Sequence, residues 1–93
     1  MDEADAGNAI SQYNLGVCYA KGNGGEVDLA EAVRWFRKAA GQGMPQAQYN
    51  LGLCLSRGAG VEKNEVEGAM WLNSAARQGD EEAERMLNAW WGD

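Results

Sequence analysis

The chain has 93 residues, of which 45% are hydrophobic and 24% charged, so it can fold around one modest core but is too short for a catalytic domain with a second lobe. Its 14 acidic and 8 basic residues give a net charge of −6. This charge repels phosphate backbones and anionic lipid surfaces, and it argues against nucleic acid or a membrane as the partner.

The sequence repeats itself after 36 residues. Segment 12–16 returns as segment 48–52, and both read Gln-Tyr-Asn-Leu-Gly. Further pairs at this spacing are Cys18/Cys54, Gly22/Gly58, Glu31/Glu67, Trp35/Trp71 and Gln42/Gln78. A period of about 20 to 50 residues is typical of units that are stable only when stacked on one another. We therefore predict one domain, 1–93, with units at about 8–43 and 44–79 and a capping half-unit at 80–91.

The first unit predicts two helices. The side chains expected to face the core of the first helix lie on one stripe: Ser11, Leu15, Cys18 and Tyr19. Gly22 ends this helix, and Asp28 with Glu31 forms a capping pair that begins a second helix. The second helix carries Trp35, also expected in the core, and ends at Gly43.

The second unit repeats this pattern. Pro45 stands at the first helical position, Gly58 ends the first helix, and Asn64 begins a second helix that ends at Gly79. Because Gly68 replaces the Ala32 of the first unit, we expect thinner packing between these two helices.

Glycine in the middle of a helix costs about 1 kcal/mol relative to alanine, so Gly16 and Gly52 predict close approach of a neighbouring helix. A fifth helix is expected from Asp80 to Trp91. Trp90 and Trp91 are interpreted as the cap that covers the end of the stack.

Catalytic, metal and cofactor chemistry finds little support. The chain has no histidine, which removes the commonest general base and the usual zinc ligand. Cys18 and Cys54 occupy equivalent places on helices about 8–10 Å apart, farther than the about 7 Å that a disulfide spans, so both are predicted to be reduced core residues. No cofactor is expected.

The combined pattern is specific enough to suggest a family. The elements Gln-Tyr-Asn-Leu-Gly-x-Cys, then Glu-Ala-x-x-Trp (Glu-Gly in the second unit) and Ala-Ala-x-Gln-Gly, resemble the Sel-1-like repeat over residues 8–79, with a partial third unit at 80–91. This family is related to the tetratricopeptide repeat. The resemblance implies an all-α, right-handed superhelix that acts as an adaptor between proteins and has no catalysis of its own.

Some bacterial members of the family are cysteine-rich, bridge the two helices of each unit and have been linked to penicillin-like compounds. The positions that would carry such a cysteine are Ala40 and Ala76 here, which argues against this subgroup.

The resemblance also points to a binding surface, because the first helix of each unit lines the concave side of such stacks. The residues placed there are Tyr13, Val17, Lys21, Gln46, Tyr49, Leu53 and Arg57. They suit an extended or helical peptide whose carboxylate is held by Lys21 and Arg57. An ordinary solvated face with tyrosines packed on neighbouring helices explains the same pattern.

The function predicted is thus a non-catalytic module that binds a protein or peptide partner, as a monomer. The alternative is a structural or self-associating fragment of a longer array, and a more remote one is a protein that binds small molecules or cell-wall fragments. The start of the chain lacks the features of a signal peptide and no apolar run reaches the about 20 residues of a membrane span, so we expect a cytoplasmic protein or an excised domain of an exported one.

Overall fold

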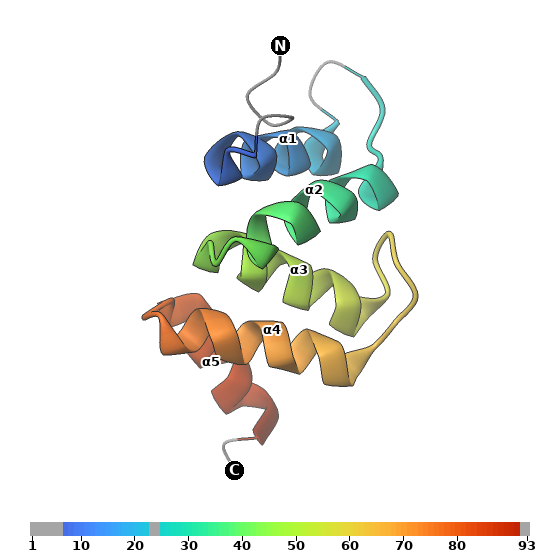
Figure 1. The fold of residues 1–93 in the computed structure, drawn as a ribbon. Coiled ribbons are helices and arrows are strands. Elements are labelled where there is room, and N and C mark those ends of the chain that lie inside the picture. The colour runs from blue at the N-terminus through green and yellow to red at the C-terminus, as the bar shows by residue number, and fades with distance from the viewer. Residues whose placement is uncertain (1–6, 23–24, 92–93) are drawn as a thin grey trace.

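The part of the chain that the structure describes folds into five helices, of which the first four are stacked one after another in alternating directions and the fifth packs against the fourth (Figure 1). The computed structural model describes residues 7–22 and 25–91, without the side chains of 90 and 91. The helices are α1 (Ala9–Lys21), α2 (Leu29–Gly41), α3 (Pro45–Arg57), α4 (Glu65–Arg77) and α5 (Glu81–Trp91). The described part contains no strand, so the prediction of an all-α solenoid is confirmed.

Short-range hydrogen bonds fix the helix boundaries. The side-chain oxygens of Asp28 and Asn64 accept the backbone N–H of the residue three positions later, at 3.0 and 2.9 Å. Asp80 caps the start of α5 in the same way at 3.0 Å. Gly22 and Gly58 end α1 and α3 with φ of 73° and 72°, a left-handed conformation that glycine adopts without a steric penalty. The predicted starts at Asp28 and Asn64 and the stops at Gly22 and Gly58 are therefore confirmed, whereas α2 and α4 end two residues before the predicted Gly43 and Gly79.

The core divides into two clusters. The larger lies between the two units and is made of Ala32, Val33, Phe36, Ala39, Ala40, Ala47, Leu51 and Leu55. The smaller joins α4 to α5 through Leu72, Ala75 and Ala83, with Met86 and Leu87 packed against it. Thus α5 does cover the last full unit, but the predicted role of the Trp90 and Trp91 side chains lies outside the described residues.

Glycines allow the helices of each unit to approach closely. A Cβ added at Gly16 would lie 2.6 Å from the Phe36 ring, and one added at Gly52 would lie 2.7 Å from Leu72 and 2.8 Å from the carbonyl oxygen of Gly68. The predicted close approach is confirmed. The expectation of thinner packing at Gly68 is wrong, because a Cβ there would lie 2.8 Å from the Gly52 carbonyl oxygen; the two backbones fill the space that side chains fill elsewhere.

Buried amides tie successive helices together. Gln42 donates to the side-chain oxygen of Gln12 at 2.7 Å, and Gln78 donates to that of Gln48 at 2.9 Å, one repeat later. Gln48 in turn donates to the backbone carbonyl of Ala40 at 3.2 Å. Gln12 and Gln48 are both buried, with 5% of each residue exposed, because these hydrogen bonds satisfy the polar groups of their amides.

The predicted core stripe of α1 is wrong in part. Cys18 is exposed and Tyr19 is 37% exposed, whereas the buried residues of α1 are Gln12 and Gly16. The helix is rotated from the expected orientation because glycine faces Phe36 at the closest contact, and a glutamine lies inside through its bond to the next helix. Ser11 and Leu15 are half-buried. Trp35 and Trp71 are also half-buried rather than fully enclosed.

Candidate functional site

A groove of about 410 Å³ runs between the first helices of the two units. From α1 it is lined by Tyr13, Val17, Ala20 and Lys21, and from α3 by Asn50, Leu53, Cys54 and Arg57. Leu29 and Phe36 of α2 and Ala59 of the following loop complete it. Five of the seven residues predicted for the binding surface therefore lie together.

The walls of the groove are apolar and held in place by the core. Tyr13, Val17 and Cys54 are partly buried against the larger cluster. The ring of Tyr13 also contacts that of Phe36, with 5.9 Å between centroids and 43° between planes. Such tilted aromatic contacts favour one orientation of the ring, so the contact with Phe36 supports Tyr13 where it lines the groove.

Two cations lie at one end of the groove. Lys21 and Arg57 occupy the last turns of α1 and α3, where the helix dipole favours positive charge. Both side chains are exposed, and neither is among the ion pairs found in the part of the chain that the structure describes. The groove thus combines an apolar floor with two cations available to a ligand.

Gln46 and Tyr49 do not line this groove. Gln46 is exposed, and Tyr49 packs against the smaller cluster beside Leu72 and Ala83. Burial, assisted by the nearby Glu82, raises the pKa of the Tyr49 phenol above its ordinary value. Tyr49 is the equivalent of Tyr13 in the next unit, so it lies one step along the stack, between α3 and α5.

The two cysteines differ in environment although their positions are equivalent. Both are free, but Cys18 is exposed and Cys54 is half-buried in the groove. Burial raises the pKa of the Cys54 thiol, against the opposing effect of Arg57. The prediction of free thiols is confirmed, and that of a core position is wrong for Cys18 because α1 is rotated.

Neither a metal site nor a membrane span emerges from the described residues. They contain no group of three or more histidine, cysteine, aspartate or glutamate side chains able to hold a metal ion. Within the same residues, every helix is too short or too polar to cross a bilayer.

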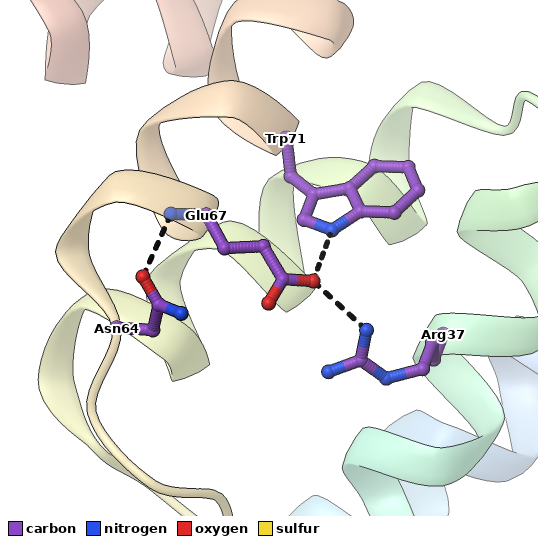
Figure 2. A network of polar contacts seen from close by, with 4 residues as sticks. All are labelled: Arg37, Asn64, Glu67 and Trp71. Carbon is purple, nitrogen blue, oxygen red and sulfur yellow. Dashed lines mark hydrogen bonds and ion pairs between the residues drawn. The ribbon is translucent and has the colours of Figure 1, made fainter.

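A polar clasp joins the units on the side formed by the second helices (Figure 2). One carboxylate oxygen of Glu67 accepts a hydrogen bond from Arg37 of the preceding unit at 2.9 Å and from the indole N–H of Trp71 at 3.2 Å. The bonds from Arg37 and Trp71 lower the pKa of the Glu67 carboxyl below its ordinary value. Asn64 fixes the start of the helix that carries Glu67.

Comparison with known proteins agrees with this architecture. Residues 9–44 and 45–80 each match the model of the Sel1 repeat. The chain belongs to the Sel1 repeat family. Over 40 residues, 43% of its length, it is also 42% identical to mouse (Mus musculus) DAP3-binding cell death enhancer 1, of which it covers 8%.

Three solved structures superpose on this chain. A Sel1 repeat protein from Oxalobacter formigenes is 39% identical with a TM-score of 0.91, covering 94% of this chain and 65% of its own. A protective antigen of uropathogenic Escherichia coli with the same type of fold is 38% identical with a TM-score of 0.90, over 92% of this chain and 18% of its own. Cysteine-rich protein B of Helicobacter pylori is 29% identical with a TM-score of 0.79, and the match covers 84% of this chain and 59% of that protein's chain. The chain thus spans less than two thirds of each relative named here.

Proposed function

We propose that this Sel1 repeat chain is a non-catalytic interaction module that binds a peptide segment of a protein partner in the groove between α1 and α3. The observation that carries the proposal is the juxtaposition of Tyr13, Val17 and Leu53 with the cations Lys21 and Arg57 in one groove. Membership of a helical-repeat family whose members mediate protein interactions supports it.

The chemistry of the groove defines the ligand. Apolar side chains of the peptide would rest on Val17, Leu53 and the Tyr13 ring, and a carboxylate would lie between Lys21 and Arg57. Hydrogen bonds to a charged group contribute about 1.5–3 kcal/mol each, and aromatic and arginine residues dominate many interfaces. We therefore expect a short segment in which aliphatic or aromatic residues precede an acidic residue or a free carboxyl terminus.

Selection from a random peptide library tests this specificity. Peptides that bind the unmodified protein should share an apolar segment followed by a carboxylate. The double variant Lys21→Glu/Arg57→Glu should bind them at least about tenfold more weakly, equivalent to the loss of about 1.4 kcal/mol. Arg77→Glu/Arg85→Glu changes the net charge by the same amount outside the groove and should bind as before.

The two cysteines provide an internal footprint of the groove. A bound peptide should slow alkylation of Cys54, which lines the groove, and leave that of the exposed Cys18 unchanged. Mass spectrometry of the alkylated protein reports the two rates in one sample. Peptides that bind without protecting Cys54, or that bind the groove variant equally well, would place the binding site elsewhere.

A second candidate function, self-association, is favoured by one observation. Val66 and Met70 on the outer side of α4 are 74% and 64% exposed, whereas the equivalent positions of the first unit carry Ala30 and Arg34. Exposed apolar side chains are candidates for contact with a further repeat. Sedimentation analysis distinguishes the two functions, since a concentration-independent monomer that still binds the selected peptides supports the interaction module.

A further inference from the structure

A second hollow, of about 540 Å³, lies on the outer side of α2. Its lining from α2 includes Arg34, Arg37 and Lys38, and its floor is formed by Ala30, Val33 and the loop residue Val61. The α2 residues that line the groove, Leu29 and Phe36, are not part of it. The hollow and the groove are therefore two separate surfaces of the same helix.

The hollow is built between the two units. The loop that joins α3 to α4 lies across the start of α2, and the approach is so close that a Cβ at Gly60 would overlap Leu29. The end of this loop is fixed by a backbone hydrogen bond of 2.7 Å from Asn64 to Leu55. The wall provided by Gly60 and Val61 is therefore held against α2 by the fold.

The lining carries three cations and no acidic residue, although the chain as a whole has a net charge of −6. Arg37 is held by Glu67 at 2.9 Å. Arg34 is only loosely paired with Glu31, at 3.7 Å, and its side chain is 73% exposed. The Lys38 ammonium lies over the Trp35 ring, 4.4 Å from its centroid. Arg34 and Lys38 can thus turn to a ligand without breaking a tight ion pair.

The fold does not require these cations. The positions equivalent to Arg34, Arg37 and Lys38 in α4 are Met70, Asn73 and Ser74. The second unit forms the same helix with no charge at these places, and of the three cations Arg37 alone forms an ion pair across the units among the described residues. Arg34 and Lys38 are thus cations that the second unit does not repeat.

We propose that this hollow is a second docking site, which takes an acidic segment of a partner protein. Two carboxylates would pair with Arg34 and Lys38, while an aliphatic side chain between them contacts Ala30 and Val61. A polyanion such as nucleic acid, or an anionic membrane, would be repelled by the acidic remainder of the chain, whereas a short peptide meets only the local charge. The site is independent of the groove and does not depend on the function proposed for it.

The probe is a short synthetic peptide of alternating glutamate and leucine, blocked at both ends, with a matched control in which glutamine replaces every glutamate. Titration into isotopically labelled protein, followed by amide chemical shifts, should move signals of residues 30–38 and 60–61. Arg34→Glu/Lys38→Glu should weaken binding at least about tenfold and abolish these shifts. Arg77→Glu/Arg85→Glu and the groove variant Lys21→Glu/Arg57→Glu should retain them. Arg37 is left unchanged because it holds Glu67.

Several results would overturn the proposal. The first is that the glutamine peptide binds as tightly as the glutamate peptide, and the second is that the amide shifts are confined to the groove. The third is that Arg34→Glu/Lys38→Glu binds the peptide as tightly as the unmodified protein while its amide spectrum shows that it is folded. Binding of phosphatidylserine vesicles without binding of the peptide would make the hollow a membrane contact instead. If the unmodified protein is a dimer and Arg34→Glu/Lys38→Glu is a monomer, the occupant of the hollow is a second copy of this chain.

Discussion

The two repeat units share the glutamate and the tryptophan of the polar clasp but use them differently. In the second unit Glu67 accepts hydrogen bonds from both Arg37 and Trp71. In the first unit the equivalent Glu31 pairs, among the described residues, with Arg34 of its own helix, at 3.7 Å. The indole N–H of Trp35 is buried with no hydrogen-bond partner among the described residues.

The difference teaches that a clasp needs residues from two successive units. Glutamate and tryptophan recur at the repeat spacing, but the arginine that orients Glu67 comes from the unit before. An unpaired buried donor costs about 1–3 kcal/mol, so equivalent residues stabilise the two units unequally.

The largest expected effect comes from placing a carboxylate either in the interface between the two units or in the interface between the second unit and α5. Ala47 and Ala83 are equivalent and fully buried, and an unpaired carboxylate at either site is strongly unfavourable. Ala47→Asp should cost at least about 4 kcal/mol because it divides the larger cluster. Ala83→Asp should cost only about 2 kcal/mol, since α5 can detach from the end of the stack. Urea denaturation followed by circular dichroism measures both, and equal losses would show that α5 is coupled as tightly as α3.

The next effect comes from the glycines at the closest helix contacts. In Gly52→Ala the new Cβ meets the backbone oxygen of Gly68 at 2.8 Å, so α3 and α4 must separate; we expect a loss of about 2–3 kcal/mol. In Gly16→Ala the close atoms belong to the Phe36 ring and the nearest backbone oxygen is 3.2 Å away, so a loss of about 1 kcal/mol is expected. Thermal and urea unfolding of the two variants test the order, and a more stable Gly52→Ala would contradict the close backbone contact.

The clasp itself should contribute less. Glu67→Gln removes the charge that Arg37 and Trp71 bind and should lower the free energy of unfolding by about 1 kcal/mol. Glu31→Gln should change it by less than about 0.5 kcal/mol, because the distance to Arg34 is 3.7 Å and the Arg34 side chain is 73% exposed. A double-mutant cycle with Arg37→Met isolates the coupling across the units. A coupling energy of zero would mean that the clasp orients the side chains without stabilising the stack.

The smallest effect is the pH dependence of the same contact. Because the Glu67 pKa is lower in the folded protein than in the unfolded chain, its contribution is complete above the unfolded value of about 4.3 and is lost as pH falls through the folded value. The difference in unfolding free energy between the unmodified protein and Glu67→Gln should therefore shrink on acidification. Glu31→Gln serves as the control, and a difference that grows at low pH would contradict the assigned direction.

Sequence predicted most of the fold because its signals are local. The starts of α1, α2 and α4 lie at capping side chains such as Asp28 and Asn64, α3 starts at Pro45 instead, and these four helices end within two residues of a glycine such as Gly22. The rotation of α1 was missed because its interior is marked by Gln12, whose partner Gln42 is 30 residues away. A hydropathy pattern contains no information on such a partner.

The groove was predicted in part for a related reason. The spacing of Tyr13, Val17 and Lys21 places them on one side of α1, and the repeat places Leu53 and Arg57 on the same side of α3. The repeat pattern predicts Tyr49 in the same group, because its sequence position is equivalent to that of Tyr13. In the stack, equivalent residues lie one step apart, so Tyr49 belongs to the contact between α3 and α5. The basic hollow was not predicted, since a loop from the second unit forms its wall.

The buried glutamines have a consequence for how such a chain can be lengthened. Gln48 accepts from Gln78 on one side and donates to the Ala40 carbonyl on the other, so each amide faces in one direction along the stack. A shift by one helical turn at any joint would leave a buried amide without a partner. Insertion of a whole second-unit copy, residues 45–80, recreates the same joint each time, whereas insertion of a fraction of a unit cannot. The directed hydrogen bonds of this one side chain thus require that gene duplication or protein engineering extend the array by whole units.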